Sequence, residues 1–193
     1  MIRNLFACLL LTAFSMFNGA RGQAITAPKY KQSVPPRESY NFNREWKFTL
    51  GDQKNAEQSN YQDKNWDDIN LPHSFSTPYF GMGQWYVGYG WYRKHFNVPA
   101  SWKGKRLFIE FEGAFRDAEV FLNGKPVGHH QSGYTGFSYE ITDAAVSGDN
   151  VLAVRLNNLW NAQLAPRDGD HNFCGGIYRD VYLLVTNPAH ITW

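Results

Sequence analysis

Hydrophobic and polar residues alternate along most of the chain from residue 40 onward. The clearest case is 106–115, where odd-numbered and even-numbered residues form two different faces. One face consists of Leu107, Ile109 and Phe111, and the other consists of Phe108, Glu110 and Glu112. Because successive side chains of a strand point to opposite faces, this period of two predicts a β-strand. Similar patterns predict further strands at 91–98, 118–122, 127–130, 136–141, 151–158 and 177–185.

The first predicted strand covers residues 40–50. Its large apolar residues all fall on even positions: Tyr40, Phe42, Trp46, Phe48 and Leu50. This spacing predicts one continuous strand that ends at Gly51-Asp52. The polar stretch that follows, 53–70, is expected to be a connection, and Pro72 excludes a helix that continues through it.

Turn signals separate the predicted strands. Asn123-Gly124 predicts a two-residue hairpin turn, and Gly148-Asp149-Asn150 predicts a turn before residue 151. No stretch after residue 22 shows helical periodicity. The sequence therefore predicts an all-β sandwich or jelly roll. The residues expected to face inward are Leu107, Ile109, Phe111, Val120, Leu122, Leu152, Val154 and Leu156.

The N-terminal 22 residues have the pattern of a secretory signal peptide. Arg3 precedes an apolar run, Leu5–Phe17, that is too short to span a bilayer, and small residues follow. The run continues past Cys8, which excludes a lipidation box. We expect a secreted or periplasmic protein with no membrane span, in which 1–22 is the signal peptide and 23–38, with three prolines, is an extended arm.

The folded domain is expected at 39–186. Asn187-Pro188 interrupts the pattern, and Ala189–Trp193 resembles the start of another strand. We therefore interpret 187–193 as a linker or as the start of a further domain.

Charge and cysteine content narrow the function classes. The chain has 19 basic and 17 acidic residues. Removal of 1–22 takes away Arg3 and Arg21, and 19 minus 2 leaves 17 against 17, so nothing favours nucleic acid or an anionic membrane as a partner. Cys174 is then the only cysteine, which excludes an intrachain disulfide, and we expect a small packing residue there.

The polar loop Arg167–Phe173 is the best candidate for a site. Asp168, Asp170 and Asn172 follow the opening of a calcium-binding loop, but the glycine and the glutamate that an EF-hand needs are missing. A looser sodium or calcium site at Asp170 stays open. Gly175-Gly176, directly afterwards, lets the backbone turn sharply or approach another segment closely.

Two other polar pairs are weaker candidates. Glu110 and Glu112 share a strand face and could form a glycosidase carboxylate pair, but a solvated sheet face is the preferred interpretation. His129 and His130 are adjacent on a strand and point to opposite faces, so they are poor joint metal ligands. The aromatic, glycine-rich stretch 74–90 predicts packing against a ligand or a neighbouring domain. Aromatic residues make up 17% of the chain, and aromatic rings suit the C–H faces of sugars.

Five segments together resemble the N-terminal sugar-binding jelly-roll domain of glycoside hydrolase family 2, the β-galactosidase and β-glucuronidase family. These segments are 42–48 (FNREWKF), 66–73 (WDDINLPH), 90–94 (GWYRK), 118–125 (AEVFLNGK) and 176–181 (GIYRDV). The resemblance implies a galactose-binding-like β-sandwich that belongs to a secreted, exo-acting β-glycosidase.

In that family the sandwich precedes an immunoglobulin-like domain and a (β/α)8 barrel. The resemblance places both catalytic glutamates on the barrel, whose motifs this chain lacks, so no catalytic residue is assigned here. Asp170, seven residues before Ile177, matches the aspartate that the sandwich lends to the sugar site, and Asn172 lies in the same loop. The resemblance implies no required cofactor and allows Na⁺ or Ca²⁺ in the assembled enzyme.

Two alternatives stay open at this point. The chain could be a free-standing carbohydrate-binding module without catalysis, or a fragment of a gene without function. The sugar and its linkage are not set by these residues, because the barrel loops determine them in the family.

Overall fold

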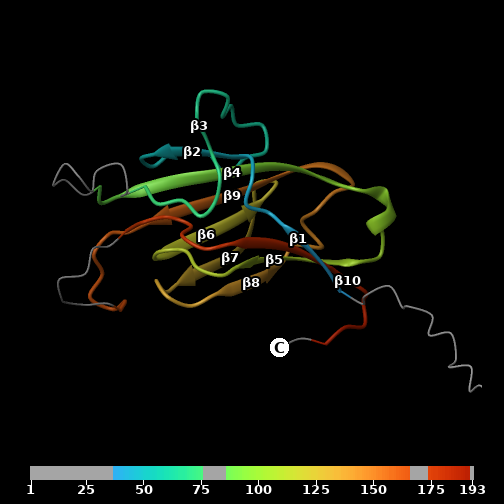
Figure 1. The fold of residues 1–193 in the computed structure, drawn as a ribbon. Coiled ribbons are helices and arrows are strands. Elements are labelled where there is room, and N and C mark those ends of the chain that lie inside the picture. The colour runs from blue at the N-terminus through green and yellow to red at the C-terminus, as the bar shows by residue number, and fades with distance from the viewer. Residues whose placement is uncertain (1–36, 76–85, 166–173, 192–193) are drawn as a thin grey trace, which may run out of the picture. The chain divides into compact units, whose positions relative to one another are not determined.

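The computed structural model describes residues 37–75, 86–165 and 174–191, which form two antiparallel β-sheets (Figure 1). The elements in chain order are β1 (Arg37–Asn41), β2 (Trp46–Leu50), β3 (Asp67–Ile69), β4 (Tyr89–Val98), the 3₁₀ turn η2 (Ala100–Trp102), β5 (Arg106–Phe111), β6 (Asp117–Leu122), β7 (Lys125–Gln131), β8 (Phe137–Glu140), β9 (Gly148–Asn157) and β10 (Val181–Thr186). This part of the chain contains no helix long and apolar enough to cross a membrane.

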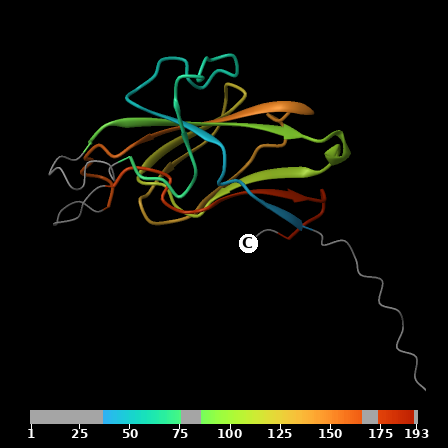
Figure 2. The same cartoon turned by 45° about the horizontal axis from the view of Figure 1, so that its top comes forward.

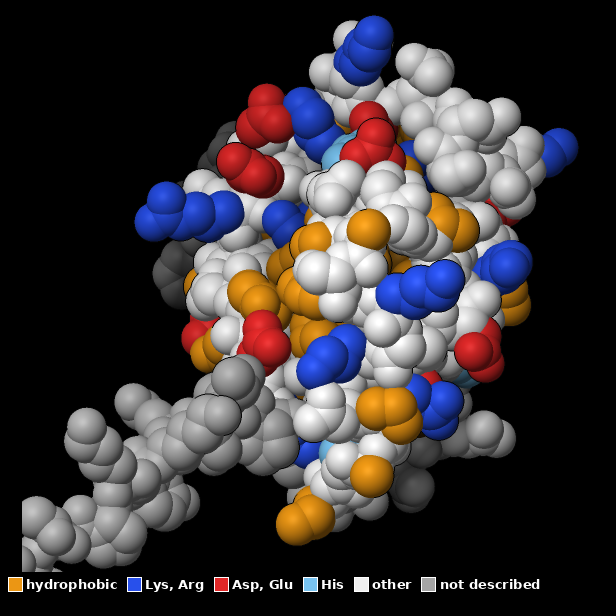
Figure 3. All heavy atoms as spheres, turned by 90° about the vertical axis from the view of Figure 1, so that its right-hand side faces the viewer, with side chains coloured by type: hydrophobic (Ala, Val, Ile, Leu, Met, Phe, Trp, Pro, Cys, Tyr) orange, Lys and Arg blue, Asp and Glu red, His pale blue; other side chains and the backbone are white. Residues whose placement is uncertain are grey.

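One sheet has four strands in the order β1-β10-β5-β8, and the other has six in the order β3-β2-β4-β9-β6-β7. Figure 2 shows β10 and β4 in separate layers. Figure 3 looks onto the end of the sandwich that carries η2, where hydrophobic side chains gather in the middle and Lys and Arg side chains lie close by. The all-β sandwich expected from the sequence is confirmed.

The core lies between the two layers. All eight residues expected to face inward are buried, and β5 and β10 are paired so that their apolar faces match, with Ile109 opposite Leu183. Fully burying one such side chain contributes about 1.5–3 kcal/mol, so the facing rows of these strands account for much of the cohesion of the sandwich.

The hairpin at Asn123-Gly124 is also confirmed. Both residues have positive φ angles, 52° and 81°. That is the backbone of a type I′ turn, whose twist matches the right-handed twist of the strands β6 and β7 that it joins.

The single strand predicted over 40–50 is wrong, because the chain changes sheets inside it. β1 belongs to the four-stranded sheet and β2 to the six-stranded one, and the crossing passes through Glu45, whose φ is 58°. The Asn43 side chain fixes the crossing. It accepts a hydrogen bond from the Val181 amide at 2.9 Å and donates to Asp180 at 2.9 Å.

Several predicted boundaries also differ. The strand β1 includes Arg37 and Glu38, which the sequence predicts as the end of the arm. Gly148–Asn150 begin β9 instead of forming a turn, because the Asn150 side chain closes the preceding turn through hydrogen bonds with the backbone of Val146. The strand β3 lies in the stretch expected to be a connection.

Two predictions for the C-terminal part of the chain also differ from the structure. The final strand starts at Val181 instead of Ile177. In the described residues after it, 187–191 form no strand, and the His190 ring packs against Phe108 with a centroid distance of 5.4 Å.

Candidate functional site

The predicted sugar-binding loop lies outside the described residues. Asp168, Asp170 and Asn172 fall in the stretch 166–173, so their placement stays a prediction. The structure does describe the segments on either side, which begin and end that loop.

The segment after the loop is fixed against the segment 73–75. The amide of His73 donates to the carbonyl of Ile177 at 2.8 Å, and the amide of Phe75 donates to the carbonyl of Gly175 at 3.0 Å. The Ser74 hydroxyl also donates to the Gly175 carbonyl, at 3.1 Å. These contacts hold 175–177, which follow the undescribed stretch 166–173, against 73–75, which precede the undescribed stretch 76–85.

The two glycines at this junction are required by the close approach. A Cβ atom on Gly175 would lie 1.9 Å from Cζ of Phe75, and one on Gly176 would lie 2.3 Å from the carbonyl oxygen of His73. Gly176 also has a φ of 141°, which side chains strongly disfavour. The sequence predicted a sharp turn or a close approach, and the structure shows a close approach to 73–75.

The other edge of this segment is also paired. Phe115 and Gly176 form a β-bridge in which each amide donates to the other carbonyl, at 2.9 and 3.3 Å. The Tyr178 hydroxyl donates to the carbonyl of Gly133 at 2.6 Å. The chain at 175–178 is therefore held on both sides.

A pair formed by the buried Tyr92 and the half-buried His73 lies at this junction. The Tyr92 hydroxyl is 2.9 Å from Nδ1 of His73. Tyr92 is fully buried, and burial raises the pKa of its hydroxyl well above the ordinary value. Burial also lowers the pKa of His73, although Asp67 opposes this lowering. At neutral pH both side chains are therefore uncharged. The pair holds the segment at His73 in place and contributes no charge to the junction.

The segment that follows the undescribed stretch 76–85 is held by the residue after β9. Asn158, just after β9, accepts a hydrogen bond from the Gly88 amide at 2.9 Å and donates to the Tyr86 carbonyl at 2.9 Å. The Tyr86 ring meets Phe75 edge-on at 5.7 Å. Trp160 follows and is 64% exposed. This exposed tryptophan is an additional candidate for sugar contact. The sequence holds only a weak signal for it, an aromatic residue just beyond the end of a predicted strand.

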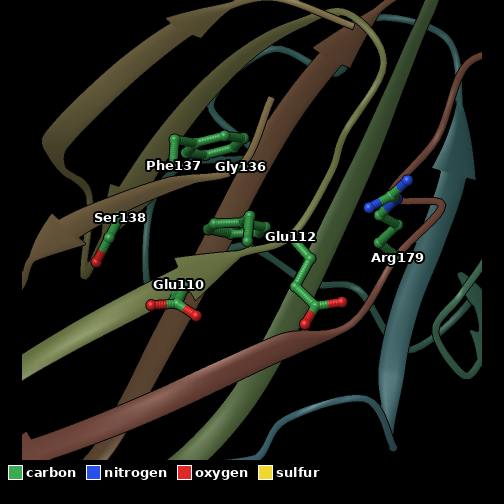
Figure 4. A pocket seen from close by; sticks show the side chains of 7 residues that line it. Glu110, Glu112, Gly136, Phe137, Ser138 and Arg179 are labelled. Carbon is green, nitrogen blue, oxygen red and sulfur yellow. The ribbon is translucent and has the colours of Figure 1, made fainter. Parts of the chain in front are cut away.

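The carboxylates of Glu110 and Glu112 line an open pocket on the outer face of β5 (Figure 4). Both extend to one side of the strand, whereas the ring of Phe137 lies on the other. Glu112 is exposed and Glu110 is half-buried. In the described part of the chain neither forms a salt bridge, and Oε2 of Glu110 is buried without a hydrogen-bond partner. The preferred interpretation, an outward sheet face, agrees with this placement.

The two histidines have separate partners. His129 lies 2.5 Å from Asp117, whereas His130 stacks on Phe137 and contacts the Thr135 hydroxyl at 3.2 Å. No group of three His, Cys, Asp or Glu side chains in the described ranges could hold a metal ion. Cys174 is half-buried with a free thiol.

Comparison with known proteins identifies the family. Residues 54–188 match the model of the glycosyl hydrolases family 2 sugar binding domain. The chain belongs to this family. A β-glucuronidase from Formosa agariphila is 36% identical over 179 residues, which cover 81% of this chain and 18% of that protein. A β-galactosidase from Thermoanaerobacter pseudethanolicus is 35% identical over 161 residues, which cover 80% and 22%.

Solved structures give the same result. Bacteroides uniformis β-glucuronidase 2, covalently bound to cyclophellitol-6-carboxylate aziridine, is 38% identical with a TM-score of 0.75, over 78% of this chain and 18% of that one. A calcium-binding mutant of the same enzyme has a TM-score of 0.73 at 38% identity, with the same coverage of both chains. The chain therefore spans about a fifth of the length of the relatives that it matches.

Proposed function

We propose that this chain is the N-terminal sugar-binding domain of a secreted β-glycosidase resembling a β-galactosidase or β-glucuronidase. The family match carries the proposal, together with relatives that are named for those two activities. Hydrolysis of terminal glycosidic bonds would take place on a (β/α)8 barrel beyond an immunoglobulin-like domain, and this chain would contribute binding without catalytic glutamates.

Within this proposal the loop 166–173 reaches the sugar. The described segment that follows this loop, Gly175-Gly176, is held against 73–75 and Phe115. An aspartate accepts hydrogen bonds from sugar hydroxyls, each of which contributes about 1.5–3 kcal/mol when the acceptor is charged. Asn172 would add an amide. A Na⁺ or Ca²⁺ ion at Asp170 belongs to the same proposal, and calcium appears in the name of a mutant of one similar enzyme.

Secretion and the outer segments are part of the proposal too. We assign 1–22 as the signal peptide, 23–36 as an extended arm, and 187–193 as the start of the connection to the next domain. The second candidate is a free-standing carbohydrate-binding module, which the exposed Trp160 beside the loop flanks favours.

The two candidates differ in a simple assay. The purified 193-residue chain should not hydrolyse aryl β-galactosides or aryl β-glucuronides. When the gene is expressed together with a downstream coding sequence for the barrel, the longer protein should hydrolyse these substrates. Turnover by the chain alone that is lost on changing Glu110 or Glu112 would overturn the proposal.

The role of Asp170 is tested in that longer protein. Asp170→Ala should lower kcat/KM at least about tenfold, because tenfold corresponds to about 1.4 kcal/mol and the loss of one charged hydrogen bond costs at least about that much. Asp168→Ala is the matched control and should change it little. Thermal unfolding should be the same for both variants. Unaltered kinetics with a lower unfolding temperature would mean that Asp170 only stabilises the turn before the last strand.

A further inference from the structure

A groove opens on the side of the sandwich where β4 extends beyond its neighbour β2. The pairing of β2 with β4 stops at Trp46 opposite Lys94, while β4 continues to Val98. On that side no described strand pairs with His95–Val98, and β1 forms the opposite wall. The groove has a volume of about 1340 Å³. None of its lining residues belongs to the flanks of the loop 166–173.

The floor of this β1–β4 groove carries a lysine that points into the sandwich. Lys94 is 6% exposed, and its Nζ donates to the carbonyl of Arg44 at 2.6 Å and lies 4.7 Å from the centre of the Phe42 ring. An ammonium group can donate three hydrogen bonds, so the Arg44 carbonyl uses one of them. Burial lowers the pKa of Lys94, against an opposing effect of Glu45. A partly desolvated cation of this kind is stabilised by an anion.

One wall of the groove offers an aromatic surface. The rings of Tyr40 and Trp102 lie 5.2 Å apart at an angle of 43°, and Tyr40 is 39% exposed. Trp102 comes from η2, at the end of the molecule shown in Figure 3, where hydrophobic side chains reach the surface. Aromatic rings of this kind bury the C–H faces of sugars.

The rim adds donors for hydroxyl groups. The side-chain carbonyl of Asn41 accepts from the Asn43 amide at 3.0 Å, and that of Asn70 accepts from the Glu45 amide at 3.1 Å. These bonds orient both side chains and leave their NH₂ groups directed to other partners. Beyond Lys94 the open edge of β4 also offers backbone N–H and C=O groups.

We propose that the β1–β4 groove binds an acidic carbohydrate chain. The carboxylate or sulfate of one sugar lies on Lys94, and the face of a neighbouring sugar packs on Tyr40 and Trp102. The charged lining of the groove consists of Lys94 and Arg44 against one carboxylate, Glu45, so it carries a net positive charge that favours an anionic sugar over a neutral one. This site goes beyond the proposed function, since it requires neither the loop 166–173 nor another domain.

The test uses the purified chain and titration calorimetry with three probes of equal length. Oligogalacturonate carries carboxylates, a sulfated galactan oligosaccharide carries sulfates, and a galacto-oligosaccharide is neutral. At least one acidic probe should bind at least about tenfold more tightly than the neutral probe. If only the carboxylate or only the sulfate probe binds, the anionic group is identified and the proposal stands.

Two substitutions then locate the site. Lys94→Met keeps the buried alkyl stem and removes the charge, and it should weaken the acidic probe at least about tenfold. Lys47→Met is the matched control and should leave the affinity for the acidic probe unchanged. Lys47 lies on the neighbouring strand β2 and forms an ion pair with Asp68 at the surface. Trp102→Ala should weaken every probe that binds, and it decides the question if Lys94→Met fails to fold.

The proposal fails on any of three results. These are no binding of either acidic probe at millimolar concentration, equal affinity for the neutral probe, or unchanged affinity in a folded Lys94→Met variant. Each of them is independent of hydrolysis in the longer protein, so failure here and failure of the proposed function can be told apart.

Discussion

From Tyr89 to Tyr92 the inner face of β4 is covered without a gap, whereas at Lys94 and Phe96 it opens into the β1–β4 groove. At the covered end a Cβ on Gly90 would lie 3.0 Å from the Phe75 ring and 3.1 Å from the Phe48 ring. At the open end Lys94 and Phe96 line a space of about 1340 Å³. One strand thus supports a close-packed base for the predicted loop at one end and an accessible surface at the other.

The outer face of β4 explains how its inner face can be open at one end. Arg93 is fully buried beneath the connection 51–66 and donates to Asp63 at 2.7 Å, and His95 lies 2.7 Å from the same carboxylate. Arg93 also donates to the carbonyls of Ala56 and Gln58. The open half of the strand is therefore held from behind, and its position does not depend on a filled interior.

The largest expected effect is at the covered end. Gly176→Ala should lower the free energy of unfolding by about 4 kcal/mol or more, because the new Cβ meets the backbone of His73 in a disfavoured conformation. Urea denaturation of the purified chain measures this loss.

Gly104→Ala is the matched control for that substitution. Gly104 also has a positive φ, 82°, but a Cβ there would have no atom within 4 Å. The control should lose about 1 kcal/mol, which is the cost of the backbone conformation alone. Equal losses for the two variants would show that the junction is not close-packed.

A smaller effect is expected behind the open end. Asp63→Asn removes the charge that pairs with the buried Arg93 and should cost about 3 kcal/mol. Asp68→Asn, whose partner Lys47 lies at the surface, should cost less than about 1 kcal/mol. Comparable losses for the two variants would mean that the buried pair is not what holds the open half of β4.

The Asp63 contacts also predict a pH dependence. Burial alone would raise the pKa of Asp63, but the hydrogen bonds from Arg93 and His95 outweigh it and hold the pKa below the ordinary 3.8. The stabilisation by Asp63 is therefore complete above pH 3.8 and is lost as the pH falls through the lower folded-state value. Acid unfolding followed by circular dichroism should be less steep in Asp63→Asn below about pH 4.

The core residues could be predicted from the sequence, because alternation with a period of two shows which residues of β5, β6 and β9 face inward. It failed at 40–50 because the crossing from Phe42 to Trp46 spans four residues, so the large residues keep even numbers on both sides of it. Side-chain alternation records which residues face the core, and here it holds no information on which sheet they belong to.

The sites behave differently from the core. Gly175-Gly176 predicted a close approach, but the partner segment 73–75 is about 100 residues away, and only the fold brings the two together. Arg93 and Lys94 are adjacent and both buried, because the connection 51–66 covers the outer face at Arg93 and the Lys94 side chain packs against Arg44 and Phe42 on the inner face. The alternation of buried and exposed residues that would have placed them is therefore absent. Asp170 and Asn172 rest on the family pattern alone, because the structure does not describe them.

The smallest expected effect separates shape from hydrogen bonding at the covered end. Tyr92→Phe removes the hydroxyl that lies 2.9 Å from Nδ1 of His73 and keeps the ring. It should cost about 1 kcal/mol, the usual net value of a buried hydrogen bond, far less than Gly176→Ala. Tyr134→Phe is the control, since Tyr134 is 60% exposed, and it should leave the urea midpoint unchanged. If Tyr92→Phe instead cost as much as Gly176→Ala, the covered end would depend on the Tyr92–His73 hydrogen bond more than on the fit of its glycines. The loop base would then weaken whenever that bond was lost, even with every glycine in place.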